Sequence, residues 1–167
     1  MTEGDGRLIT ERLFDIAARD PGKALIIDPI FGRFTYAEAA EQVRNLAWGL
    51  SRNGFVAGDG GILQLPNWAP FIFLHLALTC IGAITGNIPF VYRQREVSNI
   101  LELTGAKALI VPRVFRGFDF VVMAKALLPA HETLSHIIVV DDYHDNQCDG
   151  MLPVSYTHLT QPTNREV

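Results

Sequence analysis

Residues that could bind a metal ion gather toward the end of the sequence. Histidine and cysteine side chains there lie near three aspartates; the set is His131, His136, His144 and Cys148 with Asp141, Asp142 and Asp145. Zinc sites place such ligands at short, recurring spacings, and the spacings here match no zinc pattern. We therefore expect solvated loop side chains and assign no metal ligand.

Asp141 and Asp142 also allow a second kind of chemistry. They follow the apolar segment His136–Asp141, which includes four consecutive β-branched residues and therefore predicts a buried strand. Open α/β sheets often place ligand-binding groups directly after such strands. Because many buried strands simply end on polar residues, we favour a polar strand exit over a ligand site.

Other chemistry-bearing residues favour structural roles. His75 lies in an apolar segment and is expected to be hydrogen-bonded and partly buried, while Cys80, Trp48 and Trp68 are expected to pack in the interior. No Gly-x-Gly-x-x-Gly follows a strand, and no Gly-x-Ser-x-Gly occurs, so dinucleotide binding and hydrolase chemistry lack support. The sequence thus assigns no catalytic, cofactor-binding or metal-binding residue.

One long stretch, Gly60–Tyr92, carries no charged side chain. A membrane-spanning helix needs about 20 apolar residues, and this stretch raises that possibility. Proline and glycine interrupt it at both ends, which favours a buried strand at Ile62–Leu65, a cap at Asn67, a buried helix to Gly82 and a strand at Ile84–Phe90. We expect no stable membrane insertion, although a membrane-associated protein remains the third alternative.

Bulk properties describe a globular protein of one domain. The chain has 167 residues, of which 49% are hydrophobic and 19% are charged. A net charge of −4 does not indicate the basic surface that nucleic-acid-binding proteins carry, and two cysteines are too few for a disulfide framework. The first residues lack the basic and apolar regions of a signal peptide, so we expect a cytoplasmic protein.

Helical and strand patterns alternate along the chain. Thr10 is expected to cap a first helix that ends at Asp20, a hairpin of Ala24–Asp28 and Gly32–Phe34 follows, and Thr35 with Glu38 forms a capping box. Gly54 and Gly105 are expected to end helices. The remaining expected elements are a helix at Arg93–Thr104, a strand at Lys107–Pro112, a helix at Gly117–Leu128 and the strand at His136–Asp141. Continuous apolar strands between helices predict an α/β fold with a parallel sheet.

The pattern changes at Asp142. Residues 142–167 show no sustained period, and we expect a disordered tail there. Within it, residues 154–167 resemble the translation of a transposon-end adapter used to fragment DNA for sequencing. We therefore expect the natural protein to be truncated near Pro153, and we exclude the last residues from fold reasoning.

Several phrases, in order, resemble the amino-terminal part of the adenylate-forming acyl-CoA synthetases, the AMP-dependent synthetase/ligase family. They are Phe34–Glu38, Gly58–Asp59, Gln64–Trp68, Ile81–Ala83, Tyr92–Glu96 and Thr104–Val111. The segment Phe115–Phe120 looks most like the branch of cyclohexanecarboxylate-CoA and related acid-CoA ligases. The resemblance implies that residues 1–141 are a partial amino-terminal domain, the first parallel-sheet subdomain of the AMP-binding fold.

The resemblance also implies a reaction for the parent enzyme. Such enzymes are acid–thiol ligases that use ATP, Mg²⁺ and CoA to activate a small carboxylic acid, in fatty acid or carboxylic acid metabolism. The family's phosphate-binding loop, which ends in Pro-Lys, does not occur in this sequence. The carboxy-terminal lid that carries the family's catalytic lysine is also absent from it. This chain alone is therefore expected to be inactive, and the alternative function is a non-catalytic α/β binding or interaction module.

Two positions depart from the family pattern. Gly60-Gly61 stands where branched apolar residues usually open the strand, so this end is expected to be loose. Ile88-Pro89 replaces the more usual Asn-Pro, which puts the local geometry in question but not the fold.

Overall fold

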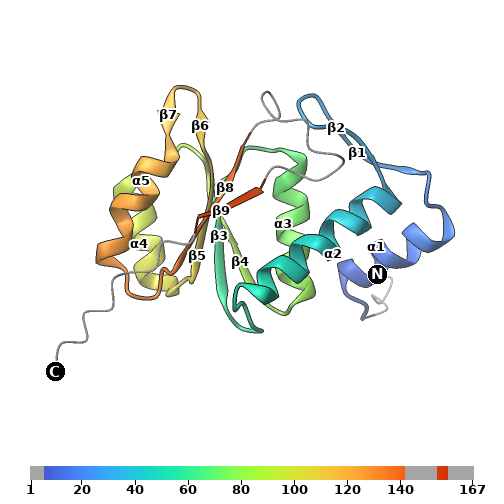
Figure 1. Cartoon of the computed structure of the whole chain (residues 1–167), viewed down its shortest axis with the longest axis horizontal. Coiled ribbons are helices and arrows are strands. Elements are labelled where there is room, and N and C mark those ends of the chain that lie inside the picture. The colour runs from blue at the N-terminus through green and yellow to red at the C-terminus, as the bar shows by residue number, and fades with distance from the viewer. Residues whose placement is uncertain (1–5, 142–153, 158–167) are drawn as a thin grey trace, which may run out of the picture.

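A parallel sheet covered by helices on both faces forms the centre of the molecule (Figure 1). The computed structural model describes residues 6–141 and 154–157. The helices are α1 (Ile9–Arg19), α2 (Tyr36–Arg52), α3 (Ala69–Cys80), α4 (Gln94–Thr104) and α5 (Phe120–Leu127), with a 3₁₀ turn at Leu128–Ala130. The strands are β1 (Ala24–Asp28), β2 (Gly32–Thr35), β3 (Gly60–Leu63), β4 (Ile84–Asn87), β5 (Ala108–Pro112), β6 (Val114–Phe115), β7 (Phe118–Asp119), β8 (His136–Val140) and β9 (Val154–Thr157).

The strand order in the central sheet is β4-β3-β5-β8-β9. The first four strands are parallel, and β9 alone is antiparallel to its neighbour. Two small antiparallel hairpins, β1–β2 and β6–β7, stand outside this sheet. The expected α/β fold with a parallel sheet is therefore confirmed.

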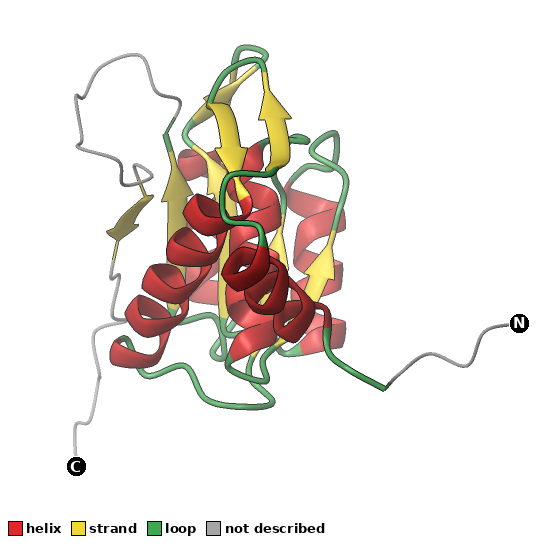
Figure 2. Ribbon diagram, turned by 90° about the vertical axis from the view of Figure 1, so that its right-hand side faces the viewer, coloured by secondary structure: helices red, strands yellow, loops and turns green. Residues whose placement is uncertain are grey.

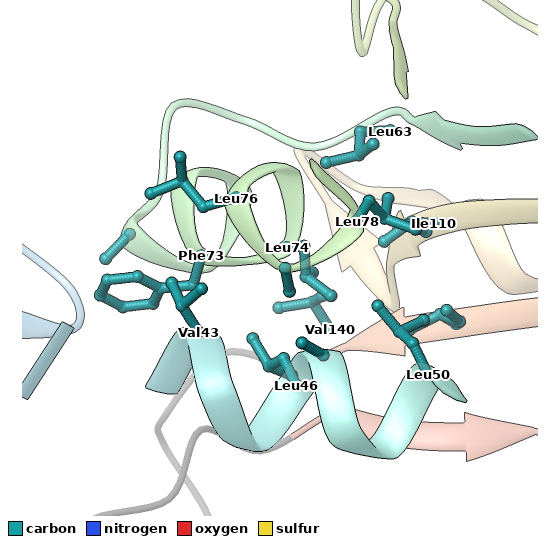
Figure 3. Close-up of a cluster of buried hydrophobic side chains, with 14 of the residues drawn as sticks. Val43, Leu46, Leu50, Leu63, Phe73, Leu74, Leu76, Leu78, Ile110 and Val140 are labelled. Carbon is teal, nitrogen blue, oxygen red and sulfur yellow. The ribbon is translucent and has the colours of Figure 1, made fainter. Parts of the chain in front are cut away.

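Alternate residues of β5 and β8 point into two separate cores. Ile110 and Ile138 join the core beneath α2 and α3, whereas Leu109 and Ile137 join the core beneath α4 and α5. Figure 3 shows the first core, where Ile110 and Val140 lie against side chains from α2 and α3. Burial on both faces explains why these strands are continuous apolar runs without alternation.

Helix α2 begins and ends as its sequence predicts. The Thr35 N–H donates to Glu38 Oε2 at 2.7 Å, and the Glu38 N–H donates to Thr35 Oγ1 at 3.3 Å, which completes the capping box. Gly54 follows the helix with φ +81°, and Gly105 ends α4 with φ +59°. Both glycines hold the left-handed conformation that terminates helices.

Two expected helix caps are wrong. Thr10 lies inside α1 and is buried; Leu8 is the N-cap, and its N–H donates to Glu11 Oε2 at 2.8 Å. Trp68 rather than Asn67 precedes α3, and its side chain makes no capping bond. The Leu8–Glu11 pair is local, three residues apart, whereas the first N–H of α3, that of Ala69, donates to Asp28, 41 positions away and beyond the reach of local sequence patterns.

The segment before α5 differs from the expected helix at Gly117–Leu128. Strands β6 and β7 form a tight hairpin there, with Arg116 and Gly117 at its turn, and α5 begins only at Phe120. The Asp119 carboxylate accepts from the Val122 N–H at 2.9 Å and caps the helix.

The amino end of β3 is not loosened by its two glycines. Gly60 and Gly61 pair with β4, and Gly61 also pairs with β5, so the strand begins two residues earlier than expected. A Cβ on Gly61 would lie 3.0 Å from Leu78 Cδ1, and one on Gly60 would lie 3.1 Å from Ala106 Cα. The glycines therefore permit a close approach of neighbouring elements.

Strand β9 corrects part of the expected tail. Val154–Thr157 pairs with β8 in continuous register, from Val140 opposite Val154 to Ile137 opposite Thr157. The expectation of a structureless tail is therefore wrong for these residues, while residues 142–153 and 158–167 lie outside the described part. The adapter origin of residues 154–167 remains a prediction, because strand pairing depends on the backbone and not on where a segment comes from.

Among the described residues, every helix is too short or too polar to cross a membrane.

Candidate functional site

The carboxyl ends of β3 and β5 mark the place where the chain changes direction across the sheet. From β3 the chain passes to α3 on one face, whereas from β5 it passes through the β6–β7 hairpin to α5 on the other face (Figure 1). Turned by 90°, the sheet lies between helices in front of it and helices behind it (Figure 2). Open α/β sheets bind ligands at such a topological switch point. The candidate site is therefore built from Gln64, which follows β3, Arg113, which follows β5, and the segments beside them.

Gln64 anchors a loop at this switch point. Its side chain is fully buried, and its Nε2 donates to Tyr92 O at 2.9 Å and to Pro89 O at 3.3 Å. The N–H of Ile88 donates to Leu63 O at 3.0 Å, so β3 holds both ends of the short segment from Ile88 to Tyr92. The departure at Ile88-Pro89 thus leaves the loop firmly attached to the sheet.

The other end of the Gln64 amide has no partner among the described residues. Gln64 Oε1 is buried and accepts no hydrogen bond there. Buried polar atoms without a partner are uncommon, and they often mark a bound water or a functional position. The residue is thus the most unusual polar group at the switch point.

Arg93 connects this loop to the β6–β7 hairpin. Its Nη1 donates to Phe90 O and Tyr92 O, both at 2.9 Å, and its guanidinium carbon lies 4.1 Å from the centre of the Phe118 ring. The Arg93 N–H donates to Glu96 Oε2 at 3.0 Å, and this bond keeps the pKa of Glu96 below its ordinary value. Arg93 therefore serves as the N-cap of α4 while its side chain closes the loop.

The hairpin turn places a second arginine over a different pair of aromatic rings, Phe90 and Phe115. Arg116 has φ +50°, a conformation that glycine or asparagine adopts more easily, and its guanidinium lies 5.2 Å from the Phe90 ring and 5.5 Å from the Phe115 ring. Phe115 in turn packs edge-on against Trp68 and Phe90. Positive charge and aromatic surface are thus combined at the carboxyl edge of the sheet.

Asp141, a candidate ligand-binding residue in the sequence, forms an ion pair. Its carboxylate accepts from Arg113 Nε at 2.6 Å and Arg113 Nη2 at 3.0 Å. The hydrogen bond and charge of Asp141 raise the pKa of Arg113. This pair joins the exits of β5 and β8, which supports a polar strand exit; Asp142 lies outside the described residues.

The structure does not assemble the histidine–aspartate set into a metal site. His131 and His136 are buried, not solvated as expected: His131 Nε2 lies 2.9 Å from Ser98 Oγ, and His136 lies 3.1 Å from Asn53 O through Nε2. His144, Asp145 and Cys148 lie outside the described residues. The Ser98–His131 contact lacks a described carboxylate to orient the imidazole, as a hydrolase triad requires.

The remaining candidates divide between interior and surface. His75 Nδ1 lies 2.9 Å from Thr85 Oγ1 in a partly buried position, as expected, and Trp68 is buried. Trp48, however, is 64% exposed and carries the Arg52 guanidinium 4.8 Å from its ring centre. Cys80 is also exposed at the end of α3, although partial desolvation raises its pKa. The expectation that Trp48 and Cys80 are interior residues is therefore wrong.

The carboxylates at this end of the sheet do not suit Mg²⁺. Asp28 accepts three backbone hydrogen bonds, Asp119 caps α5, and Asp141 is paired with Arg113. In the described part of the chain, no three His, Cys, Asp or Glu side chains form a group that could hold a metal ion. Since Mg²⁺ requires free oxygen ligands, these residues do not fit that ion.

The comparison with family models identifies this architecture. Residues 13–161 match the model of the AMP-binding enzyme family. The chain belongs to this family. Among curated relatives, it is 34% identical to the salicyl-AMP ligase/salicyl-S-ArCP synthetase of Mycobacterium tuberculosis over 82% of this chain and 25% of that protein. It is 29% identical to the 2-hydroxy-7-methoxy-5-methyl-1-naphthoate–CoA ligase of Streptomyces carzinostaticus, over 81% of this chain and 24% of that protein.

Solved structures give the same relationship. The apo structure of Mycobacterium smegmatis MbtA superimposes with a TM-score of 0.69 at 28% identity, covering 80% of this chain and 24% of that one. The fold is therefore the amino-terminal parallel-sheet region of an adenylate-forming enzyme, as expected. This AMP-binding family member spans about a quarter of the length of the curated relatives named above, at 25% and 24%.

The fold explains two of the phrases that carry the family resemblance. Asp59, from Gly58-Asp59, accepts from Lys107 Nζ at 2.7 Å and from the Val56 N–H at 2.8 Å. Burial opposes ionisation of Asp59, but these hydrogen bonds and the Lys107 charge prevail, so its pKa lies below the ordinary value. Two phrases whose paired residues are 48 positions apart thus join the amino ends of β3 and β5.

Proposed function

We propose that this chain is the amino-terminal part of an ATP-dependent carboxylic acid–CoA ligase. In the first step a carboxylate oxygen of the acid attacks the α-phosphorus of ATP, and pyrophosphate leaves as the acyl-adenylate forms. In the second step the sulfur of CoA attacks the acyl carbonyl carbon, which yields the acyl-CoA and AMP. The family assignment does not specify the acyl acceptor; the proposal names CoA as the acceptor and places adenylation of the acid before transfer to the thiol.

The family match over residues 13–161 is the observation that carries this proposal. It is supported by the parallel sheet with a switch point between β3 and β5. Both curated relatives described above are named for acid activation, one as an AMP ligase and one as a CoA ligase. No other feature of the described residues supports a different reaction class with comparable specificity.

The acid and the acceptor are the finer parts of the proposal. The names of the two relatives specify aromatic acids, salicyl and a substituted naphthoate, so an aryl acid is the first class to assay. Cyclohexanecarboxylate is the second, because of the Phe115–Phe120 segment. CoA is the proposed acceptor, and the thiol of a carrier protein is the competing one, since the name of the M. tuberculosis relative includes a carrier.

The described residues are proposed to supply the framework and not the chemistry. We assign no catalytic, cofactor-binding or metal-binding residue among them, and Mg²⁺, ATP and CoA would be bound mainly by other parts of a cytoplasmic enzyme. Gln64, Arg93 and Arg113 hold the carboxyl edge in shape by hydrogen bonds to backbone or to Asp141. This edge would face the reaction without taking part in bond making.

The test starts from the source gene, read across the codon for Pro153 by a method that uses no transposon adapter. The uninterrupted protein and the 167-residue chain would then be compared by acid-dependent exchange of pyrophosphate into ATP. Salicylate, benzoate, cyclohexanecarboxylate and a medium-chain fatty acid form the panel. We expect exchange with at least one acid for the uninterrupted protein and none for the 167-residue chain.

Two results would count against the proposal. If the reading frame continues as printed here and ends near Val167, the chain is better described as a binding or interaction module. If a longer protein is encoded but exchanges pyrophosphate with no acid of the panel, adenylation of the acid classes proposed here is excluded. Adding CoA or a carrier protein after exchange is established separates the two acceptors, because only the true acceptor releases AMP.

A further inference from the structure

Asn53 is the one asparagine in the sequence that is followed by glycine. The backbone nitrogen of a following residue can attack an asparagine side chain, and glycine has no side chain to hinder that approach. Asparagine is accordingly among the thermolabile residues of proteins. The other asparagines precede bulkier residues; they are Asn45, Asn67, Asn87, Asn99, Asn146 and Asn164.

The Asn53-Gly54 pair lies where α2 ends. Asn53 is the C-cap of the helix, and Gly54 follows it with φ +81°. Asn53 is partly buried and Gly54 is exposed, with nothing within 4 Å of the position that a Cβ of residue 54 would take. Water and base therefore have access to this turn.

The folded conformation of the turn opposes the reaction. Ring closure would join the Gly54 nitrogen to Asn53 Cγ, so this nitrogen and Asn53 Cβ must lie on the same side of the Cα–C bond. At the observed ψ of 19° they lie on nearly opposite sides. The Gly54 N–H also donates to Ser51 O at 3.1 Å, and Asn53 Nδ2 donates to Gly49 O at 2.8 Å. The turn must open before the ring can form.

Two side chains from distant parts of the sequence hold the carbonyl groups of the turn. Lys107, which precedes β5, donates through Nζ to Gly54 O at 2.6 Å. His136, which begins β8, places Nε2 3.1 Å from Asn53 O. Both side chains also lie against the ring of Phe55, at 5.3 Å and 5.0 Å from its centre. Opening of the turn therefore requires the amino edge of the sheet to loosen.

We propose that Asn53 is a site of spontaneous covalent modification, and that the Lys107 and His136 contacts set its rate. The Gly54 nitrogen loses its proton and attacks Asn53 Cγ; the new C–N bond closes a succinimide ring, and the Cγ–Nδ2 bond breaks as ammonia leaves. Water then opens the ring at Cγ, which yields isoaspartate or aspartate according to whether the main-chain carbon or Cγ is attacked. The reaction is independent of which acid the enzyme activates.

The products alter the amino edge of the sheet. A carboxylate at position 53 has no hydrogen to donate to Gly49 O, and it lies at the negative end of the α2 dipole. Isoaspartate also adds a methylene group to the backbone, which displaces Gly54 O from Lys107 Nζ. Both products should therefore weaken the end of α2 and the contacts that β5 and β8 make with it.

The first experiment incubates the 167-residue chain at neutral pH, folded and in concentrated urea, and follows its peptides by mass spectrometry. In urea, we expect Asn53 to convert to aspartate and isoaspartate faster than any other asparagine. In the folded chain, the conversion should be at least about tenfold slower. Conversion in urea no faster than at the other asparagines would refute the site, and equal folded and urea rates would refute its control by the fold.

The second experiment removes one of the controlling contacts. Lys107→Met deletes the bond to Gly54 O and should raise the folded-state conversion rate of Asn53 at least about fivefold. Asp119→Ala is the matched control, because it removes the α5 cap and leaves the turn intact, so its rate should stay near that of the wild type. If K107M does not unfold cooperatively, His136→Phe, which keeps an aromatic ring in place, takes its role. An unchanged rate in the folded variant, or an equal rise in D119A, would overturn the proposal.

Discussion

The carboxylate of Asp28 accepts a hydrogen bond from the N–H of Ala69 at 2.6 Å, although the two residues are 41 positions apart. Asp28 ends β1, and Ala69 is the first residue of α3. The same carboxylate accepts from Ile30 at 2.7 Å and Phe31 at 3.0 Å through Oδ1, and it is buried. One side chain thus shapes the β1–β2 turn and caps the central helix of the first core.

Replacement of Asp28 by alanine is expected to lower the free energy of unfolding by about 3 kcal/mol, because three backbone N–H groups lose a charged acceptor. Asp28→Asn keeps acceptor capacity and should cost less. Asp119→Ala is the matched control, since Asp119 caps α5 at an exposed position with a single bond and should cost about 1 kcal/mol. Urea unfolding measures all three, and equal losses for D28A and D119A would contradict the capping role.

Gln64 offers a test of the loop anchor. Gln64→Leu removes the bonds to Pro89 O and Tyr92 O and should cost about 2 kcal/mol while the loop amides exchange faster. Gln64→Glu should be worse at pH 7, because a buried carboxylate would face two carbonyl oxygens.

The Gln64→Glu variant also predicts a pH dependence. Burial would raise the folded-state pKa of the new carboxyl group above its unfolded value of about 4.3. Stability is then greatest below the unfolded pKa, where the protonated acid can donate, and declines as the pH rises through the folded pKa. Urea unfolding of both variants between pH 4 and pH 7 should show that Q64E becomes progressively less stable than Q64L as the pH rises. A difference in the free energy of unfolding that stays constant would contradict a buried position for this side chain.

Asp59 and Lys107 predict a different pH dependence. The pKa of Asp59 is lowered in the folded state, so the stabilisation it provides is present above its unfolded pKa of about 3.9 and is lost as the pH falls through the folded value. Asp59→Asn should therefore be less stable than wild type at pH 7, by about 1 kcal/mol, with the difference vanishing near pH 2. Denaturation of both proteins across this range checks the prediction, and a difference that persists in acid would count against it.

Gly86 predicts a steric effect. A Cβ at this position would lie 2.6 Å from Ile62 Cδ1, and Ile62 is buried. Gly86→Ala should cost about 2 kcal/mol through overpacking, and Ile62→Val in the same chain should recover part of that loss because it removes the contacted methyl group. Gly22→Ala is the control, since nothing lies within 4 Å of its Cβ position. Additive losses in the double variant would mean that the clash is relieved elsewhere.

The sequence by itself was sufficient for the features that depend on neighbouring residues. The α2 capping box needs only Thr35 and Glu38, which lie one helical turn apart, and the glycines at 54 and 105 end helices through their own backbone freedom. Alternation of apolar strands and helices predicted the parallel sheet, and the ordered phrases predicted the family that the comparison later showed.

The tertiary structure alone decided the contacts between distant segments. Nothing near Asp28 indicates that it meets Ala69, and nothing near Gln64 indicates that it holds Tyr92, 28 residues away. The Arg113–Asp141 pair, the buried His131 and His136, and the exposed Trp48 likewise depend on which faces the packed elements present. Periodicity along a chain reports which face of an element is apolar, but the partners of a buried polar group are selected only when the elements pack.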